Sequence, residues 1–326
     1  HVGDFSSPSL LTPDEERVLL GWIDAGSPKQ TSENPLAPEQ ATVSSGWTLG
    51  EPDLVVEFEA KSIPATGLVP YRYVDAEINN QEGLWVRAAE LRGTVPQVMH
   101  HALVFANKGR SSARDPRRWF RFVFAAFAPG IGPSIWPEAT GHFLPPGSVV
   151  TVQIHYISRG YPTVDRPRLG LYLYEKAPRQ EMKVTVLLTY DLVIPPYAQR
   201  FPVRIEQILD RDILLYGFRP HMHYRGRSMK VWATPPKGEK KLLLSVPNYT
   251  FDWQSYYHLA EPTALPAGTL LEAEGVFDNS PQNRYNQDPS QTVTWGLQIE
   301  DEMLLVYLYH VEVRGKNRVE KQKRSS

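Results

Sequence analysis

The 326-residue sequence contains no cysteine. That absence excludes a disulfide, a thiolate zinc site, a thiol nucleophile and a covalently attached c-type haem. No apolar run approaches the roughly 20 residues that a membrane-spanning helix needs, so a transmembrane protein is not expected. Charge of one sign is not in excess either, because 35 Lys and Arg residues against 36 Asp and Glu residues give a net charge of −1. Without a basic field, nucleic acid is not an expected partner.

Helix-forming segments are scarce. One helix is indicated near the start, where Thr12 can act as the N-cap, Pro13 suits the first helical position and Gly26 supplies the stop. Residues 27–46 are polar, rich in proline and aperiodic, which predicts a linker. Residues 315–326 form a basic stretch, which predicts a solvated terminal tail.

From about residue 47 the pattern changes to short strand-like runs separated by turn clusters. With 16 Tyr, 12 Phe, 8 Trp and 29 Pro, the composition also favours strands and turns over helices. We therefore expect an all-β fold of two antiparallel sandwiches, with a first domain at 47–178 and a second at 179–314. The expected strands cover residues 54–60, 98–106, 119–127, 148–157, 168–176, 182–191, 212–219, 228–234, 242–246, 269–277 and 304–313.

The grouping of the nine histidines is the most informative chemical feature. His221 and His223 are two apart in a strand-like run, so both can point at one ion from the same face. His100 and His101 are adjacent, and they can share an ion only if a bulge or a strand end turns one of them. His155 closes another strand-like run, and imidazole sets without cysteine suit copper or zinc. Three histidines without partner spacing are expected to be structural: His142, His258 and His310.

Four motifs in order resemble the ligand motifs of the type II copper, ascorbate-dependent monooxygenases, which include the peptidylglycine α-hydroxylating and dopamine β-monooxygenases. The motifs are VMHHALVF, QIHY, RPHMHYRG and IEDEMLLVY, and the resemblance covers roughly residues 47–313. Stretches such as VPNYTFDWQSYYHLAEP resemble a bacterial branch in which this module follows a cytochrome c-like segment. The resemblance implies two jelly-roll β-sandwich domains, with one copper on each, that face each other across open solvent.

The resemblance also implies two copper ions per chain and a ligand set for each. An electron-transfer copper would be held by His100, His101 and His155. A second, catalytic copper that activates dioxygen would be held by His221, His223 and Met303. A soft thioether ligand favours Cu(I), the form that meets oxygen, although spacing alone would make this methionine a core residue.

Two further residues match positions with which the peptide-hydroxylating members bind a substrate carboxylate. Arg219 lies two residues before His221, and Tyr307 lies four residues after Met303, so each shares a strand face with a ligand if the strands are regular. An arginine is suited to bidentate carboxylate binding. The family's intervening asparagine is Leu305 here, which leaves the substrate open between a small molecule and a peptide-like one, and a salt bridge is the alternative role for Arg219.

The implied activity is copper-dependent hydroxylation of a C–H bond of an organic substrate by dioxygen, with an ascorbate-like or cytochrome reductant. Two alternatives stay open, a non-oxygenating copper-binding or electron-transfer module and a subunit of a redox complex. The resemblance implies an extracytoplasmic location, periplasmic or secreted. Residues 1–26 resemble the last helix of the cytochrome c-like segment, so haem c is implied only for a segment before His1.

Overall fold

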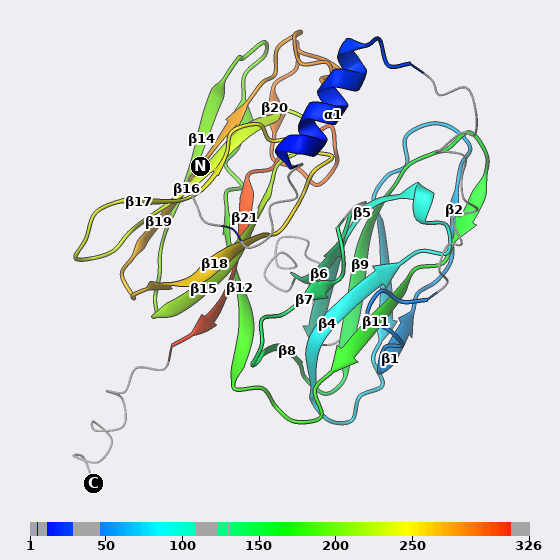
Figure 1. Ribbon diagram of the computed structural model, residues 1–326, viewed down its shortest axis with the longest axis vertical. Helices are drawn as coiled ribbons and strands as arrows, with labels where there is room; N and C mark the ends of the chain where they lie inside the picture. The colour runs from blue at the N-terminus through cyan, green and yellow to red at the C-terminus, as the bar shows by residue number, and fades with distance from the viewer. Residues whose placement is uncertain (1–4, 6–11, 29–45, 109–122, 129–130, 314–326) are drawn as a thin grey trace.

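The computed structural model describes residues 5, 12–28, 46–108, 123–128 and 131–313. Half of the described residues are in strands and 6% in helices, which confirms the predicted all-β class. Figure 1 shows the strands gathered into two neighbouring groups, with the helix at their periphery. Most of the predicted linker at 27–46 and the predicted tail at 315–326 lie outside the described residues, as do residues 119–122 of one predicted strand.

The predicted helix is α1 (Pro13–Asp24), and its ends follow the sequence rules. The Thr12 hydroxyl accepts the backbone N–H of Glu15, and the Glu15 carboxylate accepts the backbone N–H of Thr12. Gly26 follows the helix at φ +81°, in the left-handed region that glycine tolerates. No residue of α1 is buried, so neither sheet covers its apolar stripe in the described part of the chain. Among the described residues no helix has the length and hydropathy of a membrane span.

A four-stranded antiparallel sheet in the N-terminal half has the strand order β3-β9-β5-β6. Every residue of its strand β9 is buried, including the polar side chains of Ser148, Thr151, Gln153 and His155. A second set of strands packs against it, in the order β1-β11-β4-β8 with β7 paired to β4. The bounds are β1 Leu54–Glu57, β3 Arg72–Glu77, β4 Leu84–Arg92, β5 Met99–Lys108, β6 Val123–Phe127, β7 Ser134–Ile135, β8 Thr140–Leu144, β9 Ser148–Tyr156 and β11 Arg168–Leu173.

The C-terminal half contains the antiparallel sheet β14-β19-β16-β17 and the strands β12-β21-β15-β18. A two-residue parallel pairing between β8 and β12 joins these last four strands to β1-β11-β4-β8, so one sheet runs through both halves. The bounds are β12 Gln180–Leu188, β14 Phe201–Ile208, β15 Ile213–His221, β16 Gly226–Thr234, β17 Lys241–Val246, β18 Tyr257–Leu265, β19 Leu270–Phe277 and β21 Leu305–Glu312. Short elements complete the fold: β2 Lys61–Ile63, β10 Thr163–Asp165, β13 Val193–Ile194, β20 Val293–Thr294 and a 3₁₀ turn at Pro96–Val98.

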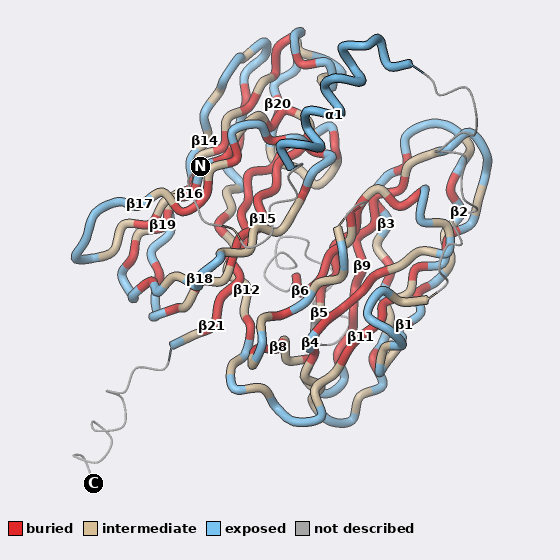
Figure 2. The backbone as a smooth tube through the Cα atoms, viewed as in Figure 1, coloured by how far each residue is buried: buried red, intermediate tan, exposed pale blue. Residues whose placement is uncertain are grey.

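Strand β21 divides two apolar cores. Alternate side chains along it, such as Val306 and Leu308, belong to the core of the C-terminal half. Those between them, such as Leu305 and Tyr307, belong to a cluster that continues into the core of the N-terminal half. Figure 2 shows the resulting buried band along β21 and β15. The face of the C-terminal half that carries Arg219 and His221 is therefore directed toward the N-terminal half.

All eleven predicted strand segments contain a strand, but others were missed for identifiable reasons. Strand β4 has the sequence LWVRAAELR, whose alanine, leucine and glutamate favour a helix in isolation. Strands β14 and β18 contain Pro202 and Pro262, which argue against a strand. Both lie at sheet edges, where proline is tolerated because one side of the strand needs no ladder hydrogen bond.

Two histidines outside the predicted ligand sets should make the metal-free protein sensitive to acid. Burial lowers the pKa of His142 and of His310 to about 4. The unfolded chain takes up protons at these residues near pH 6.5, so it binds more protons than the folded chain between pH 6.5 and 4. Each histidine should lower the free energy of unfolding by about 1 kcal/mol per pH unit as the pH falls through that window.

Urea unfolding between pH 4.5 and 7.5 checks this expectation. His310→Gln keeps a side chain able to bond the Thr185 hydroxyl, which lies 2.9 Å from Nε2 of His310, but cannot take up the proton. The pH slope of this variant should be shallower than that of the wild type. An identical slope in the two proteins would contradict the assignment.

Candidate metal centres

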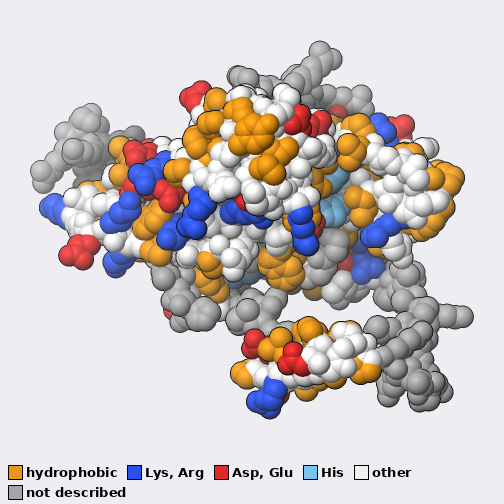
Figure 3. Space-filling model, turned by 90° about the horizontal axis from the view of Figure 1, so that it is seen from above, with side chains coloured by type: hydrophobic (Ala, Val, Ile, Leu, Met, Phe, Trp, Pro, Cys, Tyr) orange, Lys and Arg blue, Asp and Glu red, His pale blue; other side chains and the backbone are white. Residues whose placement is uncertain are grey.

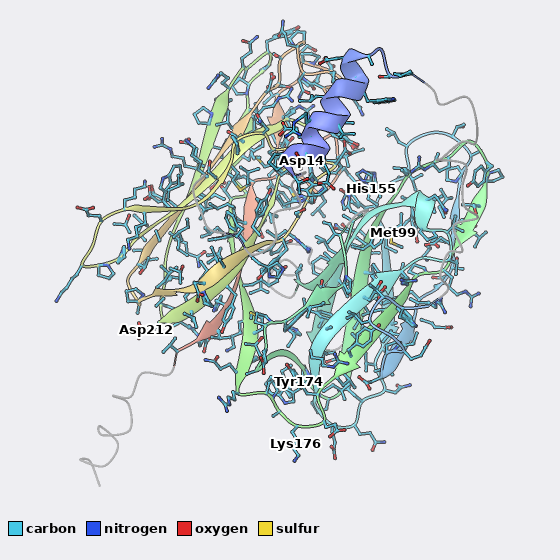
Figure 4. All side chains as sticks on the ribbon, viewed as in Figure 1. Asp14, Met99, His155, Tyr174, Lys176 and Asp212 are labelled. Carbon is cyan, nitrogen blue, oxygen red and sulfur yellow. The ribbon has the colours of Figure 1, made fainter. Side chains whose placement is uncertain are left out.

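The first cluster consists of His100, His101 and His155, at one end of the sheet β3-β9-β5-β6. His101 is directly opposite His155 in the β5–β9 ladder, and the register shifts between Met99 and His101. His100 is therefore the extra residue of a bulge, which meets the condition that the sequence set for two adjacent histidines to share an ion. The three ring centroids lie 5.0 to 5.3 Å apart. Figure 4 labels His155 and Met99 at this end of the sheet.

The nitrogen atoms of the first cluster have the geometry of a ligand set. One ring nitrogen from each histidine lies within 4.8 Å of the others. The Nδ1 atoms of His100 and His101 are 3.0 Å apart, a spacing that suits two nitrogens each about 2.0 Å from one ion. Nδ1 of His155 is buried and has no hydrogen-bond partner among the described residues. A buried nitrogen without a partner destabilises the fold, and a bound metal ion would supply that partner. The cluster therefore fits a metal such as copper.

The outer ring nitrogens of this cluster have oxygen partners. Nε2 of His100 lies 3.1 Å from a carboxylate oxygen of Asp252, and Nε2 of His101 lies 3.2 Å from the hydroxyl of Tyr71. With the proton on each Nε2 donated to these oxygens, both Nδ1 lone pairs face inward. This arrangement is typical of metal-ligating histidines, whose second nitrogen is held by an outer partner.

The second cluster begins where β15 ends at His221, with His223 two residues on. Their ring centroids are 5.2 Å apart with the planes at 88°. Nδ1 of His221 is 2.7 Å from the Gln254 side-chain oxygen, and Nδ1 of His223 is 3.1 Å from the Asp301 carbonyl. Both partners accept, so each Nδ1 carries the proton. Within the described part of the chain no hydrogen bond involves either Nε2. Those two nitrogens are available to a metal ion.

The fold brings the backbone of Met303 close to that of His223. Leu305 is the register partner of His221 and the last pair of this ladder, with Met303 two residues before Leu305 and His223 two residues after His221. The carboxylate of Glu302 binds these segments together, since one oxygen accepts the backbone N–H groups of His223 at 2.9 Å and Met303 at 3.1 Å. Its other oxygen accepts the N–H of Arg225 at 2.6 Å. Two imidazoles and a thioether fit copper, with the soft sulfur suited to Cu(I).

Burial keeps four of the predicted histidine ligands neutral at neutral pH. It lowers the pKa of His155 and His221 to about 4 and that of His223 to about 3, and it lowers the pKa of His101 well below its usual range. Burial also raises the pKa of Glu302 to about 7, against the lowering effect of the three backbone N–H groups. Neutral imidazole is the metal-binding form, so these rings need not lose a proton before they bind an ion.

The two clusters differ in one respect from the arrangement that the family resemblance implied. They do not face each other across open solvent, because the buried ring of Phe251 lies between them. Its centroid is 5.2 Å from that of His101 and 5.8 Å from that of His223. Figure 3 shows histidine side chains in the crease between the two halves. A groove of about 390 Å³, lined by His155 and Tyr224 among others, runs along the first cluster.

Arg219 and Tyr307 are register partners on β15 and β21, on the strand face that carries His221, as the sequence predicted. Both side chains are buried. In the described chain, Nε and Nη1 of Arg219 and the hydroxyl of Tyr307 make no hydrogen bond. The salt-bridge alternative for Arg219 is therefore not what the structure shows. Burying unpaired donors of a cation costs several kcal/mol, which marks this place as able to bind an anionic group.

Several residues at the two clusters could not be assigned from the sequence. One segment supplies three of them, Phe251, Asp252 and Gln254. They lie far from the predicted ligands along the chain and form no motif with ligand spacing. Glu302 was adjacent to a predicted ligand, but its contacts with two separate segments depend on the fold. Tyr71 carries no sequence signal for its contact with His101.

Comparisons with known proteins bear on the C-terminal half. No curated protein matches the chain. The similar solved structures include the infectious bursal disease virus Gx strain, at 10% identity over 82% of this chain and 74% of that chain with a TM-score of 0.22. The VP2 subviral particle of the same virus is 11% identical, over 82% of this chain and 73% of that chain, with a TM-score of 0.21. Scores this low carry no argument about fold or function.

The family comparison is specific. Residues 181–323 match the model described as the copper type II ascorbate-dependent monooxygenase C-terminal domain. The matched stretch contains His221, His223 and Met303, together with Arg219 and Tyr307. Over residues 181–323, less than half of its length, the chain is similar to the C-terminal domain of the copper type II ascorbate-dependent monooxygenases.

Proposed function

We propose that this chain is a copper-dependent monooxygenase that hydroxylates a C–H bond of an organic substrate. One atom of dioxygen enters the C–H bond and the other leaves as water, with two electrons from an ascorbate-like or cytochrome reductant and two protons. The observation that carries the proposal is the pair of imidazole clusters, each with inward ring nitrogens left for a metal ion. Copper at the two clusters would supply one-electron redox chemistry and dioxygen activation.

The proposal gives the two clusters different roles. The first cluster would serve electron transfer, because the groove along His155 gives a reductant an approach to it. The second cluster would be the catalytic one, because its thioether ligand Met303 suits Cu(I). Around both, Asp252, Tyr71 and Gln254 fix the histidine rings so that the correct nitrogen faces inward.

The proposed substrate carries an anionic group. Arg219 and Tyr307 are next to the second cluster, and their unpaired donors suit a carboxylate. The rings of Tyr256 and Tyr309 are 4.6 Å apart, and both lie close enough to Arg219 for its charge to act on their hydroxyl groups. These rings would offer an aromatic surface to an organic substrate. A carboxylate bound here would hold the substrate in a fixed position relative to His221.

The wider organisation stays part of the same proposal. We assign a first copper domain to residues 47–178 and a second to residues 179–314, with residues 1–26 as the remnant of a cytochrome c-like segment. An extracytoplasmic location in a bacterium follows from the resemblance of the whole module.

The test is copper stoichiometry by elemental analysis after anaerobic loading. We expect two copper ions per chain, with His155→Ala and His221→Ala each losing one. His310→Gln is the matched control, since His310 is a buried histidine outside both clusters and should leave two ions bound.

The other outcomes separate the alternatives. One copper or none would contradict the paired-centre mechanism and favour a simple binding module. Two coppers without oxygen consumption by the reduced protein would favour a non-oxygenating electron-transfer module. Two coppers with substrate-dependent oxygen uptake would support the monooxygenase.

A further inference from the structure

Residues 251–254 contact both histidine clusters. This segment lies between β17 and β18, and its side chains diverge to different centres. Asp252 accepts from Nε2 of His100 in the first cluster, at 3.1 Å. Gln254 accepts from Nδ1 of His221 in the second cluster, at 2.7 Å. Within the segment, the Gln254 amide donates to the carbonyl of Phe251 at 3.0 Å, which ties the two contacts into one unit.

The ring of Phe251 fills the space between the clusters. It is 4% exposed and packs with Tyr71 and Ile299, one residue from each half of the chain. It stacks on His100, with centroids 5.7 Å apart and planes at 23°, and meets the ring of His223 edge-on at 88°. A rigid ring in contact with both clusters fixes how closely they approach.

We propose that residues 251–254 are a positioning element that couples the two metal centres. Asp252 orients a ligand of the first centre, Gln254 orients a ligand of the second, and Phe251 sets their separation. The proposal rests on the proposed function in that both clusters are taken to bind copper.

The physical consequence is thermodynamic coupling. A metal ion that immobilises His100 also orders Asp252, and through the hydrogen bond within the segment it orders Gln254 and hence His221. The second ion then binds to a ligand that is already ordered, so each centre should raise the affinity of the other. Coupling between two sites typically amounts to at least about fivefold in affinity.

Copper(II) titration in a mutant cycle tests the coupling. The affinity of the second centre is measured with the first centre intact and with it removed by His155→Ala. We expect removal to weaken the second centre by about fivefold or more in the otherwise wild-type chain. In a Phe251→Leu background, the copper affinity of the second centre should be nearly the same with the first centre intact and with it removed. Equal ratios in the two backgrounds would overturn the proposal.

Individual substitutions separate positioning from general damage. Asp252→Ala should weaken the first centre by about 10-fold, and Gln254→Ala should weaken the second by a similar factor. Asp252→Asn, which keeps an acceptor oxygen, should recover part of the affinity. Trp253→Ala is the matched control, because this side chain is 42% exposed. In this variant, removal of the first centre should weaken copper binding at the second centre by the same factor as in the wild type. An equal effect of Trp253→Ala and Asp252→Ala would mean a merely structural role.

A measurement on the metal-free protein keeps this proposal distinct from the proposed function. The Phe251 ring should shift the imidazole proton resonances of His101 and His223, and Phe251→Leu should move both. If the resonances move but copper does not bind, the proposed function fails while the position of Phe251 stands. If copper binds at both centres and neither resonance moves, the positioning element fails alone. Pulsed EPR on the protein with two Cu(II) ions should show a longer and broader metal–metal distance in Phe251→Leu.

Discussion

Replacing Glu302 with alanine should abolish copper binding at the second cluster and lower the free energy of unfolding by about 3–5 kcal/mol. Glu302 is fully buried, and its carboxylate accepts the backbone N–H groups of His223, Arg225 and Met303. Alanine would leave three buried donors without partners, each at a cost of about 1–3 kcal/mol. The same change releases the segments that carry two of the predicted ligands, so stability and metal affinity should fall together.

Urea unfolding and copper stoichiometry measure the two effects. Glu302→Gln retains one acceptor oxygen, which can serve His223 and Met303, so its losses should be smaller. Glu274→Ala is the control, because Glu274 pairs with the exposed Arg204 and should change stability by no more than about 1 kcal/mol. Retention of both copper ions by Glu302→Ala would show that the carboxylate does not hold the ligands in place.

Local chemistry singled out the histidine pairs, whereas the assignment of His155 to the first cluster and of Met303 to the second came from the family resemblance. The adjacent His100 and His101 needed a bulge to act together, and the bulge is present at that point of β5. The spacing of His221 and His223 predicted a shared strand face, but β15 ends at His221 and His223 lies two residues beyond that end. These features depend on a few consecutive residues, which is why sequence reasoning reached them.

The partners of the clusters depend on contacts between distant segments. Gln254 lies 33 residues beyond His221, and Asp252 lies 152 residues beyond His100. No periodicity or spacing connects such pairs, since the turn after β17 must first be placed by the packing of Phe251 between the two halves. The same packing places the Phe251 ring between the two clusters. The expectation of open solvent between them was therefore wrong.

Strand prediction failed for a related reason. The helix-like composition of β4 is overridden by its position inside a sheet, between β11 and β8. The prolines of β14 and β18 are acceptable only because both strands lie at edges, and edge position is a property of the whole sheet. The sequence shows how a segment prefers to fold in isolation, whereas the neighbours that decide these cases come from elsewhere in the chain.

Replacing Arg219 with methionine should raise the free energy of unfolding by about 1–3 kcal/mol and abolish the binding of anionic substrates. The guanidinium is buried with Nε and Nη1 unpaired within the described residues, so a side chain of similar length without charge removes a desolvation cost. Urea unfolding checks the stability. Benzoate, a simple aromatic carboxylate, should raise the melting temperature of the wild type but not that of Arg219→Met, because a ligand stabilises only the folded state that binds it.

Arg225 supplies the matched comparison, since it is as buried as Arg219 but two of its guanidinium nitrogens donate hydrogen bonds. Its Nε donates to Asn279 at 3.0 Å and its Nη1 to the carbonyl of Glu300 at 2.9 Å. Arg225→Met should therefore lower the free energy of unfolding by about 3–5 kcal/mol, the opposite sign from Arg219→Met. If both substitutions destabilise the protein equally, the charge of Arg219 is already neutralised in the folded protein and does not await a substrate. Opposite signs would mean that the charge of Arg219 destabilises the substrate-free fold. The cation beside the second cluster would then be paired only when an anionic substrate binds.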